Sequence, residues 1–124
     1  MLNFSITLKS GSPIYEQVVY AVKKAIVSGQ LEAGDKFPSV RELSRELRIH
    51  PNTAQKVVST LVQANLLEIK PGIGSVVSSI PEATRVQRED ILHTEVERLV
   101  VEAKRLSIKK KELIEAIQKQ WRSD

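Results

Sequence analysis

Cysteine is absent from the 124 residues of this chain, and aromatic residues make up only 4% of it. The lack of thiols excludes disulfide bridges, thiol catalysis and zinc sites built from cysteine. No apolar run approaches the ~20 residues that a membrane-spanning helix needs. The amino-terminal sequence also lacks the basic and apolar regions of a signal peptide. We therefore expect a soluble, cytoplasmic protein that does not associate with a membrane.

The sequence also lacks a coherent set of catalytic groups. Its two histidines, His50 and His93, fall in different segments of the chain. It has no phosphate-cradling loop, no nucleophile elbow and no cluster of histidine with acidic residues. We predict that the protein is not an enzyme and uses neither a metal nor a cofactor. His93 is most simply a surface or interface residue.

The length of the chain suits one compact domain with a short appendage, and its charge is compatible with binding to nucleic acid. The 19 basic and 15 acidic residues give a net charge of +4. Residues 1–79 carry nine basic and six acidic groups, whereas residues 80–124 carry ten and nine. The first segment is thus the more basic, which is compatible with a DNA partner. The second is nearly balanced, as expected of helices whose surfaces carry ion pairs.

The stretch from Phe37 to Ala64 contains two short helical patterns separated by a few residues, the layout of a helix-turn-helix. Ser39 and Glu42 form an S-x-x-E capping box at the start of the first helix. Its apolar positions share one face: Val40, Leu43 and Leu47. Its arginines share another: Arg41, Arg45 and Arg48. This first helix therefore has a core side and a phosphate side.

The second helix of this pair is expected to begin at Pro51, because proline suits the first helical position. Its predicted buried face consists of Ala54, Val57, Val58, Leu61 and Val62. Its predicted outward face carries polar groups that suit base edges in a major groove: Asn52, Gln55, Lys56 and Ser59. No acidic residue occurs between Glu46 and Glu68, and a carboxylate there would be repelled by DNA. This helix is the predicted recognition helix.

Simpler explanations exist for several of these side chains. Arg45 and Arg48 can pair with a neighbouring acid or simply be solvated. Asn52 and Thr53 can be local capping groups, and His50 can act as an imperfect N-cap. Arg41 is different, because a cation in the first turn of a helix is disfavoured by the helix dipole. Contact with phosphate or guanine would explain its position.

Another helix is predicted before this pair, from Pro13 to about Ser28. Ser12 before Pro13 favours a helix start there, and Gly29 marks the end. Further upstream, apolar and polar residues alternate, which predicts a short extended segment at Phe4, Ile6 and Leu8. Tyr15 and Tyr20 are expected to be packing residues. The first domain should therefore contain three helices.

A β-hairpin is predicted after the recognition helix. Asn65 is a plausible left-handed cap, Leu66–Lys70 and Ser75–Ser78 are the expected strands, and Pro71–Gly74 is the turn. Glycines such as Gly72 can serve only the turn, but directly after a helix-turn-helix they suit close approach to a minor groove or phosphate. Lys70 adds charge beside the tip. This hairpin is interpreted as the wing of a winged helix.

Ile80-Pro81 marks the expected boundary with a second segment. A long helix is predicted over Glu82–Leu106, and Ser107 is expected to cap a last helix over Lys109–Arg122. Each of these two helices carries apolar residues along one face. Two helices alone bury such faces poorly, so we expect a homodimer. The alternative is that the two helices pack back on the first domain. The predicted interface comprises Leu92, Val96, Leu99, Ala103, Leu106, Leu113, Ile117 and Trp121.

Several motifs in this order resemble the GntR family of bacterial transcription regulators. The matching stretches are Pro13-Ile14-Tyr15-Glu16-Gln17, Gly29–Lys36, Pro38–Leu43, His50-Pro51-Asn52-Thr53 and Pro71–Val77. The short remainder is similar to that of the YtrA subfamily, whose C-terminal segment dimerises. The resemblance implies a repressor, commonly of an operon for an ABC-type membrane transporter.

The resemblance also implies which residues contact the DNA. Carried over by position, these are Arg41, His50, Asn52, Thr53, Gln55 and Gly72. The outward Arg45, Lys56 and Lys70 are added from the sequence pattern. Relatives often place an arginine where Gln55 or Pro51 stands here, so the preferred base at that operator position is left open.

The combined prediction is a mostly α protein with a small β-hairpin. Residues 1–79 are expected to form a winged helix-turn-helix DNA-binding domain, and residues 80–124 a two-helix dimerisation segment. The expected partner is double-stranded operator DNA with an inverted repeat. A winged-helix module for protein interaction is the alternative. A small-molecule effector is possible, but nothing in the sequence identifies one.

Overall fold

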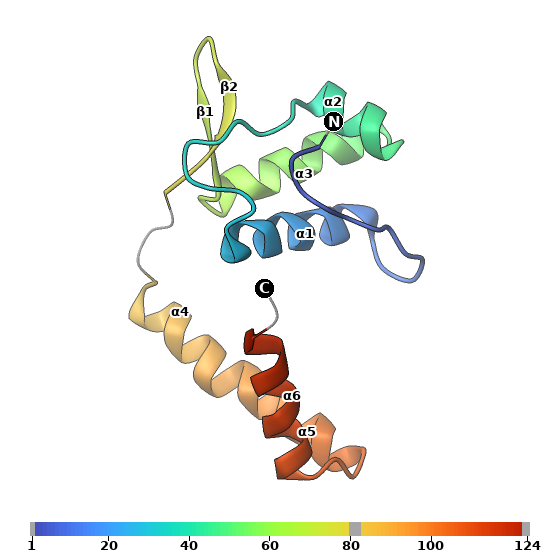
Figure 1. The fold of residues 1–124 in the computed structure, drawn as a ribbon, viewed down its shortest axis with the longest axis vertical. Helices are drawn as coiled ribbons and strands as arrows, with labels where there is room; N and C mark the ends of the chain where they lie inside the picture. The colour runs from blue at the N-terminus through green and yellow to red at the C-terminus, as the bar shows by residue number, and fades with distance from the viewer. Residues whose placement is uncertain (1, 80–82, 123–124) are drawn as a thin grey trace. The chain divides into compact units, whose positions relative to one another are not determined.

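A computed structural model describes residues 2–79 and 83–122. The chain divides into two compact units, residues 1–81 and 82–124, and each is described by itself (Figure 1). The fold is mostly helical with one two-stranded antiparallel hairpin, as the sequence predicts. The expected boundary at Ile80-Pro81 lies outside the described residues.

Three helices form the body of the first unit: α1 (Ile14–Ser28), α2 (Val40–Leu47) and α3 (Pro51–Gln63). Helix α3 packs against both α1 and α2. The largest fully buried side chains come from all parts of this unit: Leu31, Leu43, Leu61, Leu67, Val18, Val22, Val57 and Val77. Burial of each such side chain contributes about 1.5–3 kcal/mol, so this core holds the three helices in fixed relative positions.

Helix α1 ends as predicted and starts differently. Gly29 adopts φ 86° in the left-handed region at the C-terminal cap, a conformation that favours glycine. At the other end Pro13 is the N-cap without a side-chain capping bond, so the helix begins at Ile14, one residue after the predicted start at Pro13. The Ser12 carbonyl accepts a hydrogen bond from Gln17 Nε2 at 2.9 Å.

The amino-terminal segment lies on the core without forming a strand. Phe4 is buried, and Ile6 and Leu8 are half-buried between exposed neighbours. The Phe4 ring stacks on that of Phe37 with 5.7 Å between centroids. The alternating pattern therefore identifies the buried side correctly, whereas the segment is fixed by side-chain packing and not by a strand partner.

The hairpin consists of β1 (Leu67–Lys70) and β2 (Gly74–Val77), with Leu67 opposite Val77 and Lys70 opposite Gly74. Asn65 has φ 61°, in agreement with its predicted left-handed conformation.

The segment before α2 also pairs with β2, which the sequence pattern does not indicate. Gly34 N donates to Val77 O at 2.8 Å, Val77 N donates to Asp35 O at 2.8 Å, and Phe37 N donates to Ser75 O at 2.9 Å. The hairpin is thereby hydrogen-bonded to the residues that lead into α2.

The second unit contains α4 (Arg85–Glu89), η1 (Asp90–Glu95), α5 (Val96–Arg105) and α6 (Lys110–Arg122). The expected α-helix over Glu82–Leu106 is therefore wrong in its middle, because η1 is a π-helix. Within it Val96 N–H bonds to the carbonyl of Ile91, five residues earlier. One extra residue in such a turn shifts the apolar positions before it relative to those after it.

The turn between α5 and α6 also differs from the prediction. Ser107 has φ 59°, which is not the conformation of an N-cap residue, so its predicted capping role is wrong. The backbone N–H of Lys109 bonds to Glu112 Oε1 at 3.3 Å instead. The acid three residues downstream thus stabilises the start of α6.

Candidate nucleic-acid interface

Helix α2 presents its arginines from a well-capped start. Ser39 Oγ accepts from Glu42 N at 3.1 Å, and Ser39 N donates to Glu42 Oε1 at 3.3 Å, as the capping box predicts. Arg41 follows in the first turn, and Arg45 lies one turn later; both are exposed. Among the described residues no ion pair within 4 Å involves either guanidinium. Both are therefore available to an anionic partner.

Arg48 does not share this surface as predicted. It is the C-cap residue of α2 and has a left-handed backbone with φ 53°, so its side chain leaves the helical spacing of Arg41 and Arg45.

The pKa of the exposed Glu46 carboxyl is lowered, first by a hydrogen bond to that carboxyl and then by nearby positive charge, including that of Arg45. The carboxylate is therefore ionised at neutral pH.

The turn into α3 is fixed by buried and capping groups. Ile49 is buried, and Ser44 Oγ donates to its carbonyl at 2.7 Å. His50 is the N-cap of α3, and its Nδ1 accepts from Asn52 N at 3.0 Å. The expected capping role of His50 is thus present. Pro51 occupies the first helical position as predicted.

The outward face of α3 carries Asn52, Gln55, Lys56 and Ser59, all exposed, whereas Thr53 is half-buried. Gln55 Nε2 donates to Ser59 Oγ at 3.2 Å. Lys56 Nζ lies 3.9 Å from the centroid of the Tyr15 ring on α1, a contact that the sequence reading did not foresee. The face can therefore offer hydrogen-bond donors, acceptors and a cation without a carboxylate.

The hairpin combines two glycines at its tip with exposed apolar side chains. Gly72 and Gly74 have φ 77° and 110°, where a side chain would strain the backbone. Lys70 pairs only loosely with Glu68, at 3.8 Å between exposed groups. Ile69 and Ile73 are 65% and 56% exposed, and the sequence reading missed both as surface residues. Their position in a glycine-flanked hairpin is the signal that would have found them.

Comparison with known proteins identifies this arrangement of three helices and a wing. The family of bacterial regulatory proteins described as the gntR family matches residues 14–77. The chain belongs to the GntR family. Within that family it is 31% identical over 96 residues to the HTH-type transcriptional repressor YtrA of Bacillus subtilis (strain 168), covering 77% of this chain and 74% of the relative.

Solved structures support the same assignment. A GntR family transcriptional regulator from Listeria monocytogenes aligns with a TM-score of 0.69 and 30% identity, covering 90% of this chain and 98% of that one. The DNA-binding domain of AraR in complex with operator ORX1 has a TM-score of 0.54 and 24% identity, covering 60% and 96%. That likeness concerns the fold alone.

This chain is thus a YtrA-like transcriptional regulator of the GntR family with a winged-helix DNA-binding domain. Regulators of the GntR family bind DNA operators, and the relatives found are regulators and not enzymes. In the described part of this GntR-family protein, no helix is both long and apolar enough to span a membrane.

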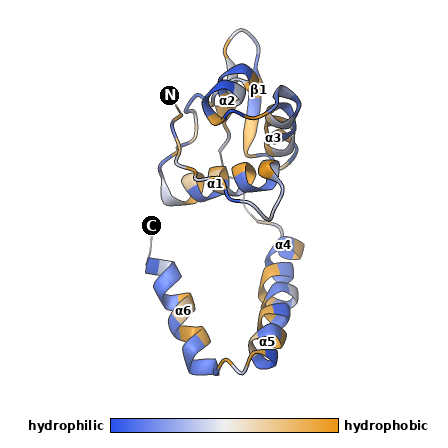
Figure 2. Ribbon diagram, turned by 90° about the vertical axis from the view of Figure 1, so that its right-hand side faces the viewer, coloured by the Kyte–Doolittle hydropathy of each residue, from blue (hydrophilic) through white to orange (hydrophobic). Residues whose placement is uncertain are grey.

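The second unit of the GntR-family protein exposes most of the residues predicted to form an interface. Six of them are at least 44% exposed: Leu92, Val96, Leu99, Leu106, Ile117 and Trp121. Figure 2 shows apolar positions at intervals along α5 and α6 among hydrophilic ones. Leu113 is half-buried and Ala103 is buried within a single chain. Ala103 therefore has little accessible surface with which to contact a second copy.

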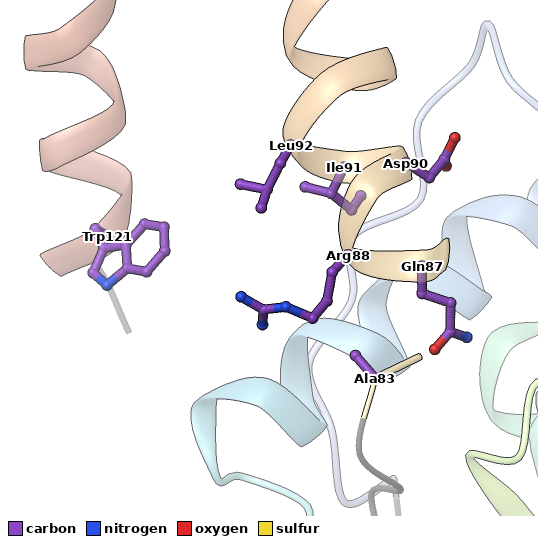
Figure 3. Close-up of a pocket in the computed structure, with 7 residues that line it drawn as sticks. All are labelled: Ala83, Gln87, Arg88, Asp90, Ile91, Leu92 and Trp121. Atoms are coloured by element: carbon purple, nitrogen blue, oxygen red, sulfur yellow. The ribbon is translucent and has the colours of Figure 1, made fainter. Parts of the chain in front are cut away.

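An open groove of about 630 Å³ lies within this unit, between Trp121 of α6 and residues of α4 and η1. Figure 3 shows Ile91 and Leu92 on the opposite side from Trp121, with Arg88 beside them. Ile91 is not among the predicted interface residues, because that prediction assumes a continuous α-helix over Glu82–Leu106. Its place in η1 brings it to the groove.

Proposed function

We propose that this GntR-family protein is a homodimeric repressor that binds an inverted-repeat DNA operator. The observation that carries the proposal is the exposed face of α2 and α3. It combines the guanidinium groups of Arg41 and Arg45, which have no ion pair among the described residues, with polar side chains and no acid on α3. DNA recognition uses such a surface, with cations on phosphates and amide groups on base edges. A module for protein interaction would leave this combination without a purpose.

The DNA contacts divide by chemistry. Arg41, Arg45, Lys56 and Lys70 supply charge for phosphates, and Arg41 can also make a bidentate contact with guanine. Asn52 and Gln55 are the base readers of α3, with His50 and Thr53 at its entrance to the major groove. Gly72 lets the wing approach the adjacent minor groove closely. In this arrangement residues 1–79 form the DNA-binding domain.

Dimerisation is assigned to residues 80–124. Apolar side chains exposed along α5 and α6 are costly in water, and a second copy would cover them. A two-fold dimer presents two recognition helices and requires an inverted repeat. Packing of these helices on the first unit is the alternative, and it would give a monomer.

Repression is proposed because the relative YtrA is named a transcriptional repressor. An operon for an ABC-type membrane transporter is the target class that the YtrA resemblance suggests. A cytoplasmic location follows from the same function, because a regulator of transcription works where the chromosome lies.

Selection of binding sites from random DNA by the purified protein tests the proposal. We expect an inverted repeat, and we expect Arg41→Ala to weaken binding to it by about 1–3 kcal/mol, roughly 5- to 150-fold. Lys119→Ala removes one exposed cation from α6 and serves as the matched control. Recovery of no preferred sequence, or equal binding by Arg41→Ala, would count against the assigned function.

A further inference from the structure

The contact between Lys56 and Tyr15 joins the recognition helix to α1. Lys56 Nζ lies 3.9 Å from the ring centroid of Tyr15, well inside the ~6 Å range of a cation–π interaction. Tyr15 is half-buried and packs against the hydrophobic core. Its hydroxyl lies 3.4 Å from Glu16 Oε1. Packing against the core therefore fixes the ring, and the ammonium of the exposed Lys56 lies over its face.

A second cation–π pair in the same unit provides a comparison. Lys24 Nζ lies 5.7 Å from the Tyr20 ring centroid, and both residues belong to α1. Tyr20 is 63% exposed, so the prediction that it is a packing residue is wrong. Its pair with Lys24 is longer than the Tyr15 pair, more exposed to solvent and confined to one helix. The attraction weakens when the cation is solvated. Of these two pairs, the Tyr15 pair is the one in which a ring on α1 contacts a side chain of α3.

The position of Lys56 on α3 gives this contact a consequence for DNA binding. Successive residues on a helix point about 100° apart, so Lys56 projects to the flank when Gln55 faces a groove. The flank of a helix in the major groove faces the phosphate backbone. No ion pair within 4 Å involves the Lys56 ammonium in the described part of the chain. Its remaining N–H donors are free for an anion.

We propose that Tyr15 is a positioning residue for DNA binding: its ring holds the Lys56 ammonium at the α1–α3 edge, ready for a backbone phosphate beside the major groove. This inference rests on the proposed function and deepens it. Lysine side chains lose rotamer freedom when they bind, and a side chain already held on a ring loses less. The ring thereby raises affinity without touching the DNA and keeps Lys56 away from the bases.

A double-mutant cycle on the full-length protein tests the inference, with Kd measured on the selected operator at several salt concentrations. Tyr15→Phe keeps the ring and should bind like the unmodified protein. Tyr15→Leu should weaken binding by about 2- to 5-fold, the effect of an exposed cation–π pair. Lys56→Met should weaken binding further and reduce the salt slope by about two, because each dimer loses two phosphate contacts. The double variant should bind no worse than Lys56→Met alone.

The matched control is Tyr20→Leu, which removes the ring of the other pair and should leave Kd unchanged. A merely structural role of Tyr15 predicts losses that multiply in the double variant, and that result would overturn the inference. Equal binding by the unmodified protein and Tyr15→Leu would overturn it as well. If Tyr15→Leu does not fold, the NMR spectrum of the free, unmodified protein decides: a ring-current shift of the Lys56 protons supports the inference, and its absence overturns it.

A measurement without DNA separates this inference from the proposed function. The Tyr15 ring current should shift the Lys56 Hε protons upfield in NMR spectra of the free protein, and Tyr15→Phe should keep the shift. Absence of the shift overturns the inference. If the shift is present but no duplex is preferred, the proposed function fails. If a duplex is preferred but Tyr15 and Lys56 variants bind it equally well, only the positioning role fails.

Discussion

In the proposed DNA complex, Gln55 is the side chain on α3 best placed to read a base. One of its two amide N–H groups is occupied by Ser59 Oγ at 3.2 Å, which orients the amide along the helix. Its carbonyl oxygen and second N–H stay available. These two groups match the N6 donor and N7 acceptor that adenine presents in the major groove.

We predict that Gln55→Ala removes the preference for adenine at one position of each operator half-site. The expected loss is about 1–3 kcal/mol for the preferred base and little for the others. Competition binding with operators varied at each position measures it. Gln63→Ala, at the exposed end of the same helix, is the control. An unchanged base profile would remove Gln55 from the list of readers.

For single side chains, the sequence predicts which face of a helix they occupy better than it predicts which residues they contact. The helical period places Arg41 and Gln55 outward, and both are exposed. Arg48 departs from its expected face because it is itself the C-cap residue of α2. Its left-handed backbone ends the helical spacing at that position. The pairing of Lys56 with Tyr15 depends on how α1 and α3 cross, which residue spacing within one helix does not encode.

Among the elements of the first unit, α2 is the short helix that begins with a capping box. It has only eight residues, and short helices are marginal in isolation. The reciprocal hydrogen bonds between Ser39 and Glu42 satisfy two backbone N–H groups that would otherwise lack partners. Packing of Leu43 then fixes the helix on the core.

We predict that Ser39→Ala lowers the free energy of unfolding by about 1 kcal/mol, because an N-cap hydrogen bond is lost. Urea unfolding monitored by circular dichroism measures the change. Ser10→Ala, at an exposed turn position, should have no comparable effect. Equal stability of the Ser39 variant and the unmodified protein would show that packing alone fixes the start of α2.

Local patterns predict the elements well where the decisive interactions are local. The capping box, the proline at the start of α3 and the Pro71–Gly74 turn are all such cases. The π-helical turn in η1 was not predictable, because it uses the same residue types as an α-helix and differs by one residue per turn. The pairing of residues 34–37 with β2 was missed because it joins segments some forty residues apart.

In the whole molecule, the apolar surface of the second unit has the clearest consequence. We predict that Leu99→Glu converts the protein from a dimer to a monomer, since a carboxylate would be buried at the interface. Sedimentation velocity measures the mass. Leu99 is 45% exposed in one copy, and Val27→Glu at an 83% exposed position of α1 is the control. A monomeric unmodified protein would contradict the dimer assignment.

In the proposed dimer, the charge of both copies together is expected to set the salt dependence of operator binding. Four cationic side chains are proposed to contact phosphates in each copy: Arg41, Arg45, Lys56 and Lys70. Eight contacts predict that affinity falls by roughly 10³- to 10⁵-fold between 50 and 200 mM salt, because condensed counterions are released on binding. Fluorescence anisotropy over that range measures the slope. A nearly flat dependence would show that few phosphates are neutralised.

The backbone pairing between β2 and the approach to α2 has one more consequence. Since Gly34, Asp35 and Phe37 share hydrogen bonds with Val77 and Ser75, the angle at which the hairpin leaves the helical body is set by main-chain atoms common to every amino acid. Exposed side chains near its tip, such as Ile73, can therefore be exchanged during evolution without re-aiming the hairpin, provided that Gly72 and Gly74 are kept. In the proposed DNA-binding role, such a construction would let one scaffold acquire new target sequences through a few exposed positions.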